Sequence, residues 1–393
     1  MPTARTSEKR GEACARARDL PQPLRVLVDG TSAHTGGGAT FLIKQLGALA
    51  QRPNVEVTAY ARRWVVDALA ARRLPLELRL APRGPLLARL LWEQLVLPWK
   101  ARRFDVVYMP GNFGLLASPR PQVVTFHNLY HFGRAGRRAR SLCDRRLALR
   151  IAIESFVARI SIRRATVPIA LSWSMRRAIE EDLGPVARLR VIYPGGAPEQ
   201  STSRAVTSSP EPFVLAVAND YPHKDWEGLI TAFQHRPDLP PLKLVGRPRT
   251  SKRRAELERR LSDGRLAKRV QLLGAIEEAD VNALYANAAC FVAHSFLESF
   301  PQTPYEAMSH GSPVVASDIP SHREVCGDYA VFYPPNRPDL LAAAVARALT
   351  DVRSRPPLPS LAFRAWSTHA EEFACALVDA ALDCSRKGGC ADA

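Results

Sequence analysis

Short runs of branched apolar residues alternate along the chain with longer stretches in which apolar residues recur every three or four positions. The short runs are typical of buried strands, and the longer stretches are typical of amphipathic helices. Near-continuous apolar strands separated by helices predict a parallel sheet that is covered on both faces. The expected strands are Leu24–Asp29, Val55–Tyr60, Leu76–Leu80, Phe104–Met109, Gln122–His127, Thr166–Leu171, Arg190–Gly196, Phe213–Ala218, Leu242–Gly246, Val270–Gly274, Cys290–Ala293, Val314–Ala316 and Val331–Tyr333.

The two halves of the chain share this plan, so the sequence predicts an α/β protein with two Rossmann-like domains. A length of 393 residues also favours two domains. A stretch poor in large apolar residues and rich in Ser, Thr and Pro separates the halves and indicates a linker. The expected organisation is a disordered tail at 1–22, an N-terminal domain at 23–197, a linker at 198–212, a C-terminal domain at 213–358 and a last helix at 359–386.

Three consecutive glycines, Gly36, Gly37 and Gly38, stand between the first expected strand and a helix expected at 39–50. Glycines in this place let a backbone approach a phosphate or a sugar closely and offer free N–H groups. The cluster lacks the G-x-G-x-x-G spacing. Two interpretations therefore stay open, an acceptor or phosphate loop and a flexible loop without a ligand.

Charge is distributed unevenly along the chain. The formal net charge is +17, and residues 1–197 carry 33 Lys and Arg against 14 Asp and Glu, whereas residues 198–393 carry 22 against 24. A single-sign field confined to one half indicates an anionic partner for that half, such as a lipid surface, a phosphorylated acceptor or nucleic acid. The other interpretation is an arginine-rich proteome, although such a bias should give both halves of the chain an excess of basic residues.

The segment 134–164 contains ten arginines interleaved with apolar residues. It predicts a basic amphipathic helix, either resting on anionic lipid or forming an ordinary surface helix with a charged outer face. The basic stretches lack the interleaved aromatic residues that stack on bases, so no nucleic-acid partner is expected.

Seven scattered cysteines without a C-x-x-C pair favour a reduced compartment. No apolar run is long enough to span a bilayer, and Met1–Asp19 lacks the apolar core of a secretory signal. The sequence also has no D-x-D and no ligand cluster, so neither a metal nor a cofactor is expected. We expect a cytoplasmic protein, with a peripheral position on the inner face of the membrane if the basic half binds lipid.

Two carboxylates, Glu298 and Glu306, stand eight residues apart in AHSFLESFPQTPYEAMSHGSPVVASD. The pattern places Glu298 in a loop after a buried strand and Glu306 in the first turn of a helix expected at 305–310. Both should face the crevice beyond the carboxyl end of the sheet, where open α/β sheets bind ligands. They are then either ordinary loop and helix-start charges or acceptors for the hydroxyls of a sugar nucleotide.

The run EAMSHGSPVVASD, followed by REVCGDYAVFYPP, resembles the donor-binding segment of family 4 glycosyltransferases. The resemblance is strong over 288–334 and looser from Leu24 to Val378. It implies the GT-B fold, with two Rossmann-like domains facing across a cleft and a C-terminal helix crossing back to the first domain. It also implies an acceptor on the N-terminal domain, a nucleotide sugar on the C-terminal domain, and retention of anomeric configuration without a metal.

The same resemblance assigns roles to individual residues. Glu306 would bind the ribose hydroxyls, Glu298 the transferred sugar and Lys224 the diphosphate. His127, at the end of the strand PQVVTFH, would face the reacting sugar, although a packed or solvated histidine is the other interpretation. Backbone N–H groups from Phe300 through Gln302 to Thr303 would help to bind the donor.

The chain departs from the family pattern at two places. Asn219 and Asp220 stand where the family has an arginine for the diphosphate, and His223 or Arg247 would compensate. Pro301 replaces a glycine and has no N–H to donate.

The expected function is transfer of a sugar from a nucleotide-diphosphate sugar to a glycolipid, polysaccharide or cell-envelope intermediate. The alternatives are an epimerase or phosphorylase on the same fold, or a non-catalytic binding protein on a degenerate fold. These residues do not specify the nucleotide, the sugar, the acceptor or the linkage.

Overall fold

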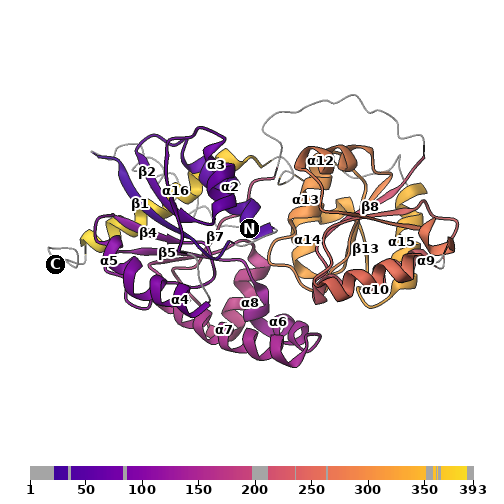
Figure 1. Cartoon of the computed structure of the whole chain (residues 1–393), viewed down its shortest axis with the longest axis horizontal. Coiled ribbons are helices and arrows are strands. Elements are labelled where there is room, and N and C mark those ends of the chain that lie inside the picture. Colours follow the sequence, from indigo (N-terminus) through magenta and orange to yellow (C-terminus); the bar gives the residue numbers. More distant parts are fainter. Residues whose placement is uncertain are drawn as a thin grey trace. The chain divides into compact units, whose positions relative to one another are not determined.

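The computed structural model describes residues 22–33, 37–82, 86–196, 211–234, 236–262, 264–350, 357–359, 361 and 364–386. These residues form two compact units, each built on its own sheet (Figure 1). Unit 1 holds the described residues up to Arg134, Arg146–Gly195 and those from Ala365; unit 2 holds those of Ala135–Arg145 and Gly196–Arg364. The expected tail and linker lie outside the described residues, apart from residues 22, 211 and 212.

Unit 1 contains a seven-stranded sheet in the order β3-β2-β1-β4-β5-β6-β7, with parallel pairing throughout. The order reverses between β1 and β4, as in a Rossmann fold. The strands are β1 (Leu24–Gly30), β2 (Val55–Ala61), β3 (Leu76–Leu80), β4 (Val106–Met109), β5 (Gln122–Phe126), β6 (Val167–Ala170) and β7 (Arg190–Val191). The helices are α2 (Gly37–Leu49), α3 (Arg63–Ala70), α4 (Leu86–Leu91), η1 (Trp92–Val96), α5 (Leu97–Ala101), η2 (Leu129–His131), α7 (Arg145–Arg164), α8 (Trp173–Leu183) and α16 (Trp366–Arg386).

Unit 2 contains a six-stranded parallel sheet in the order β10-β9-β8-β11-β12-β13, which reverses between β8 and β11. The strands are β8 (Val214–Val217), β9 (Leu242–Val245), β10 (Val270–Gly274), β11 (Cys290–Ala293), β12 (Val314–Ser317) and β13 (Ala330–Tyr333). The helices are η3 (Pro222–Lys224), α9 (Trp226–Gln234), α10 (Ser251–Leu261), α11 (Gly264–Ala267), α12 (Glu278–Asn287), α13 (Gln302–Ser309), α14 (Pro320–Cys326), η4 (Gly327–Tyr329) and α15 (Pro338–Thr350). The prediction of two Rossmann-like domains is confirmed.

Strand burial explains why the apolar runs are continuous. Every residue of β4, β5, β6, β11 and β12 is buried, because helices cover both faces of each sheet. The edge strand β3 is largely exposed and correspondingly carries Glu77 and Arg79. No helix among the described residues has the length and apolar character needed to cross a membrane.

The last helix, α16, packs against α2 and belongs to the core of unit 1. A buried polar chain fixes it there. Tyr108 Oη donates to Gln45 Oε1 (2.7 Å), Gln45 Nε2 lies 3.2 Å from His369 Nε2, and His369 Nδ1 lies 2.9 Å from the carbonyl of Tyr193. Because a carbonyl oxygen only accepts, Nδ1 of His369 carries the proton and Nε2 accepts from Gln45. Each of these buried side chains thereby has a hydrogen-bond partner.

The glycine cluster differs from the expected loop. Gly37 and Gly38 form the first turn of α2, and Gly36 lies outside the described residues. A Cβ at Gly37 or Gly38 would meet nothing within 4 Å, so close contact does not require glycine at either position. The helix was expected to begin at residue 39 and begins two residues earlier, because first-turn N–H groups need no partner within the helix, which lets a helix begin on glycines. The acceptor or phosphate role of these glycines stays a prediction. These N–H groups are still available to an anion.

Candidate functional site

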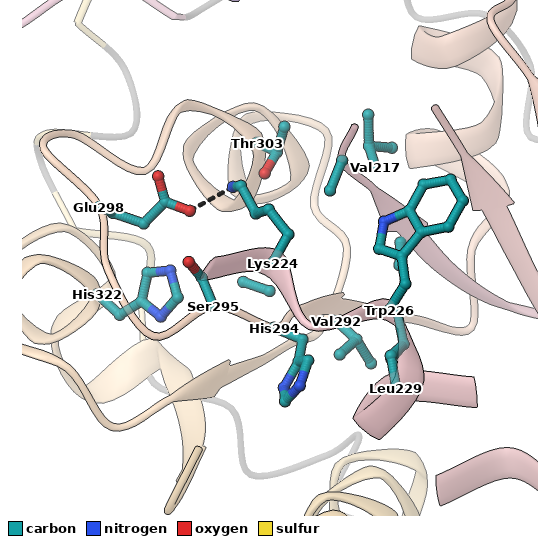
Figure 2. A pocket seen from close by; sticks show the side chains of 13 residues that line it. Val217, Lys224, Trp226, Leu229, Val292, His294, Ser295, Glu298, Thr303 and His322 are labelled. Atoms are coloured by element: carbon teal, nitrogen blue, oxygen red, sulfur yellow. Dashed lines mark hydrogen bonds and ion pairs between the residues drawn. The ribbon is translucent and has the colours of Figure 1, made fainter. Parts of the chain in front are cut away.

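A small cavity lies at the carboxyl edge of the unit 2 sheet, between the ends of β8 and β11 (Figure 2). Its lining comes from these two strand ends, from η3 and α9, and from the loop and helices that follow β11. This is the switch point of the sheet, where parallel α/β folds bind ligands. The remaining space is about 10 Å³, which is room for a single water molecule.

Lys224 and Glu298 form an ion pair in this cavity, and both side chains are largely buried (Figure 2). Burial alone would raise the pKa of Glu298. The positive charge of Lys224 outweighs burial and holds the pKa of Glu298 below its usual value. Glu298 is therefore an anion at neutral pH, and the pair presents a fixed cation beside a fixed carboxylate.

Backbone contacts bring these two residues together from segments far apart in the sequence. The carbonyl of His223 accepts hydrogen bonds from Phe296 N (2.7 Å) and Ser295 Oγ (3.1 Å). Ser295 N in turn donates to Ser317 Oγ on β12 (2.8 Å). The loop that carries Lys224 is thus fastened to the loop that carries Glu298.

A second set of contacts joins the Lys224 loop to the end of β11. Asp225 has a left-handed backbone, and its Oδ2 lies 3.3 Å from Nε2 of buried His294. Nδ1 of His294 lies 2.5 Å from Tyr333 Oη. The sequence argument missed Asp225 and His294. His294 stands in the quoted segment that begins at Ala293, but no role was assigned to it. Their only sequence signal is a position next to a strand end, which many residues share.

His322 on α14 also lines the cavity and was not anticipated. Its Nδ1 lies 2.9 Å from the carbonyl of Ser317, so Nδ1 carries the proton. Burial lowers the pKa of His322 to about 4, and burial also lowers the pKa of His223 to about 4. Both rings are therefore neutral at pH 7 and leave Lys224 as the cation of the cavity. His223 stacks on Tyr221 with the ring centroids 5.8 Å apart.

Glu306 lies in the second turn of α13, since this helix begins at Gln302 and not at Tyr305 as expected. Pro301 and Pro304 misled the prediction, because proline is tolerated in a first helical turn. Glu306 Oε2 accepts from Tyr285 Oη (3.2 Å), and Oε1 accepts from Gln302 Nε2 (3.4 Å). Glu306 does not line the small cavity.

The residues from Phe300 to Thr303 contribute unequally. Thr303 lines the cavity, whereas Phe300 is buried against Tyr305 with the ring centroids 5.5 Å apart. Gln302 N donates to the carbonyl of Phe300 (3.0 Å), so this N–H already has an acceptor.

Asn219 and Asp220 link the end of β8 to the loop after β9. Asn219 Oδ1 accepts from Arg247 N (3.0 Å), and Asp220 N donates to the carbonyl of Arg247 (3.0 Å). Asp220 Oδ2 also accepts from Arg253 Nε (3.1 Å). Arg247 is exposed. Together with Trp226 it lines a larger groove of about 980 Å³. Trp226 lines the small cavity as well, so the two hollows share a wall.

In unit 1, His127 follows the end of β5. Its backbone N–H donates to Asn112 Oδ1 (2.6 Å), and its ring meets Phe41 edge-on with the centroids 4.6 Å apart. Burial lowers the pKa of His127 to about 4, so the imidazole is neutral at pH 7. Asn112 has a left-handed backbone and also accepts from Asn128 N (2.9 Å). It therefore fixes the backbone around His127, a role that its sequence position did not reveal.

A buried acidic cluster lies at the end of β1 in the same unit. Thr31 N donates to Asp29 Oδ1 (3.0 Å), and Thr31 Oγ1 donates to Glu93 Oε1 (2.7 Å). Burial, and then the charge of Glu93, raise the pKa of Asp29 above its usual value. Across the described ranges no three His, Cys, Asp or Glu side chains are grouped as a metal site requires.

Two family models match the chain in succession. The model described as Glycosyltransferase Family 4 matches residues 35–200, and the model described as Glycosyl transferases group 1 matches residues 199–357. O-antigen chain mannosyltransferase B of Escherichia coli is 40% identical over 82 residues, which are 21% of this chain and 22% of that protein. O-antigen chain mannosyltransferase RfbU of Salmonella typhimurium is 26% identical over 183 residues, 46% of this chain and 50% of that protein.

These matches cover half or less of each mannosyltransferase. Among solved structures, Anabaena Alr3699/HepE in complex with UDP and glucose superposes with a TM-score of 0.62 at 20% identity. The superposition covers 93% of this chain and 98% of that one, and it supports the fold alone. Because the two family models together run from residue 35 to residue 357, this chain belongs to the group 1, family 4 glycosyltransferases.

Proposed function

We propose that this protein transfers a hexose from a nucleotide-diphosphate sugar to a hydroxyl of a glycan or lipid-linked acceptor, with retention of anomeric configuration. The observation that carries the proposal is the Lys224–Glu298 pair at the switch point of unit 2. The pair supports a transferase, because a fixed cation in this place can stabilise the negative charge that develops on the leaving diphosphate. The relatives are O-antigen mannosyltransferases and a structural neighbour binds UDP and glucose, so mannose and glucose are the first sugars to test.

The donor would lie across the two hollows of unit 2. Lys224 faces the diphosphate, and Arg247 supplies a second cation at the edge of the larger groove, which receives the nucleoside. Arg247 thus compensates for the missing arginine, since Asn219 holds the backbone of Arg247 at the sheet edge. Glu298 accepts from a hydroxyl of the transferred sugar. Glu306 lines neither hollow, and its assignment to the ribose hydroxyls rests on its place in the family segment.

In the reaction, the bond between the sugar's anomeric carbon and the phosphate oxygen breaks, and the acceptor oxygen forms the new bond on the same face. The proton of the acceptor hydroxyl passes to the leaving phosphate. Lys224 stabilises the negative charge that develops there. His127 is neutral and orients a sugar hydroxyl through a hydrogen bond, so no step requires it to become a cation.

We propose that turnover needs no divalent metal, because Lys224 already provides positive charge where the leaving group develops its negative charge. Initial rates in excess EDTA are expected to match those in untreated buffer. A rate that disappears in EDTA and returns with magnesium or manganese would contradict this part of the proposal.

The first half of the chain supports a peripheral position on an anionic membrane, with the arginines of 134–164 attracting the lipid headgroups. An acceptor carried on lipid would then be presented to unit 1 at the membrane surface.

The experiment that tests the donor is a thermal-shift screen of UDP-, GDP- and ADP-linked mannose and glucose. At 100 times its Kd, a ligand that binds only the native state stabilises it by about 2.7 kcal/mol, which is a rise of several degrees in Tm. The free nucleosides are the control, since they lack the diphosphate that faces Lys224. If no nucleotide sugar raises Tm more than its nucleoside does, the proposed donor site is wrong.

A further inference from the structure

Exposed large apolar side chains are concentrated in the basic half of the protein. Among the described residues, all of them except Leu142 and Tyr221 belong to unit 1. Single exposed apolar residues are normal on a protein surface. Here many of them fall on two helical segments, α4–η1–α5 and α7, so their arrangement requires an explanation.

The first ridge is formed by α4, η1 and α5, which follow one another without a break from residue 86 to residue 101. Leu91, Leu95 and Trp99 are 51%, 67% and 59% exposed and are spaced by four residues. The π-helical turn of η1 lies in the middle of this segment and has more residues per turn than an α-helix. Side chains four residues apart therefore stay closer to one line along the helix than they would in a continuous α-helix. Lys100 Nζ and Arg103 Cζ each lie 5.9 Å from the Trp99 ring centre.

The second ridge lies on α7. The sequence predicted one basic amphipathic helix in 134–164, but the structure has two, α6 (Gly133–Arg140) and α7. On α7 the apolar residues divide between two faces. Ile151 and Ile162 are buried, whereas Leu149, Ile153 and Phe156 are 66%, 60% and 66% exposed. The outer face is therefore not the purely charged surface of an ordinary amphipathic helix.

A loop between β4 and β5 joins the two ridges. Leu116 N donates to Gln94 Oε1 on η1 (2.9 Å), and Gly114 N donates to Ser161 Oγ on α7 (3.0 Å). Arg164 of α7 donates to the carbonyl of Leu116, whose side chain is itself exposed. Figure 1 shows α4 and α7 along the same side of unit 1. The two ridges with Leu116 between them form one surface, named here the apolar face.

We propose that the apolar face inserts into the interfacial layer of an anionic lipid bilayer. Its chemistry fits that layer, because a tryptophan flanked by cations resides at the level of the headgroups while leucine, isoleucine and phenylalanine enter the acyl boundary. The net charge of the same half selects anionic lipid. This inference rests on the proposed membrane position and deepens it, because part of the binding no longer depends on charge.

The test is flotation of the full chain with vesicles of phosphatidylcholine containing increasing fractions of phosphatidylglycerol, at low and at high salt. One variant carries Leu95→Ser with Trp99→Ser, and another changes Arg137, Arg138, Arg145 and Arg146 to Gln. Leu80→Ser is the matched control, since Leu80 is exposed on the edge strand β3 and lies on neither ridge. Thermal melts establish that each variant is folded.

Wild type and the Leu80 variant are expected to bind anionic vesicles at low salt and to keep a measurable bound fraction at high salt, where surface charge is screened. The Leu95 and Trp99 variant should partition at least roughly tenfold more weakly and lose the salt-resistant fraction. The arginine variant should lose binding mainly at low salt.

Unchanged partitioning of the Leu95 and Trp99 variant would overturn the inference. So would light scattering without lipid that shows a wild-type dimer and a monomeric variant, since the apolar face would then join two copies. Nucleotide-sugar binding, measured on the same proteins by calorimetry, separates the two proposals. Wild type that binds a nucleotide sugar but no anionic vesicles overturns the membrane face alone, and wild type that binds vesicles but no nucleotide sugar overturns the donor site alone.

Discussion

Replacing Lys224 with methionine is expected to lower kcat by roughly 10²–10³-fold, the loss typical for removal of one preorganised group that stabilises charge in a transition state. Lys224 is largely buried, and its loop is held in place by the contacts of the His223 carbonyl, so its charge is poorly screened and needs no rearrangement. Initial rates with the donor found by thermal shift measure the effect. Lys252→Met, an exposed lysine at the start of α10, is the control.

The same substitution leaves the buried carboxylate of Glu298 without its cation, and removing one partner of a buried pair costs about 3–5 kcal/mol of stability. Loss of stability and loss of chemistry are separated by adding Glu298→Gln. We expect this double variant to recover much of the Tm and none of the rate, because the neutral amide no longer needs a partner. A Lys224→Met protein that is folded and turns over within a few-fold of wild type would show that Lys224 is only a structural ion.

Replacing Glu306 with alanine is expected to weaken donor binding by roughly 10- to 100-fold. A hydrogen bond to a charged group contributes about 1.5–3 kcal/mol, and 1.4 kcal/mol is a factor of ten in Kd. Titration calorimetry of the nucleotide diphosphate against wild type and variant provides the measurement. Circular dichroism shows whether α13 is retained.

The structure offers a matched control for Glu306, because Tyr285 donates to its Oε2. Tyr285→Phe removes this contact and keeps the carboxylate, so it should bind the nucleotide as wild type does or more tightly. Equal weakening in both variants would mean that Glu306 acts by supporting Tyr285. Unchanged affinity of a folded Glu306→Ala protein would remove the ribose assignment.

The alternation of apolar strands and amphipathic helices was sufficient to predict both Rossmann-like units, because a strand buried on both faces must be apolar along its whole length. The ion pair of Lys224 with Glu298 was not predicted, although both residues follow strands whose carboxyl ends share one sheet edge. Ser172 caps the N-terminus of α8, where its hydroxyl accepts from Met175 N (3.0 Å), and serine is a residue type that local pattern alone favours in this place.

Other parts could not be derived from local pattern. The contact of Asp225 with His294 joins residues 69 positions apart, and nothing in either neighbourhood requires it. On α7 the leucine, isoleucine and phenylalanine residues recur at helical spacing all round the helix. Periodicity therefore could not tell which of them face the core and which face solvent. The tertiary packing of unit 1 makes that choice.

The packing of α16 also determines when each unit can be completed during synthesis. Leu42 and Leu46 of α2 share one hydrophobic core with two residues of α16, Phe373 and Leu377. This core therefore stays incomplete until the residues from 365 onward have left the ribosome. Nearly all of unit 2 lies between these two parts of the sequence. Domains usually fold in the order in which they are made. Unit 1 begins to leave the ribosome first, yet its core is completed last. Until α16 has been made, the apolar surface of unit 1 must be covered by a chaperone, or the remaining residues must be synthesised before that surface aggregates.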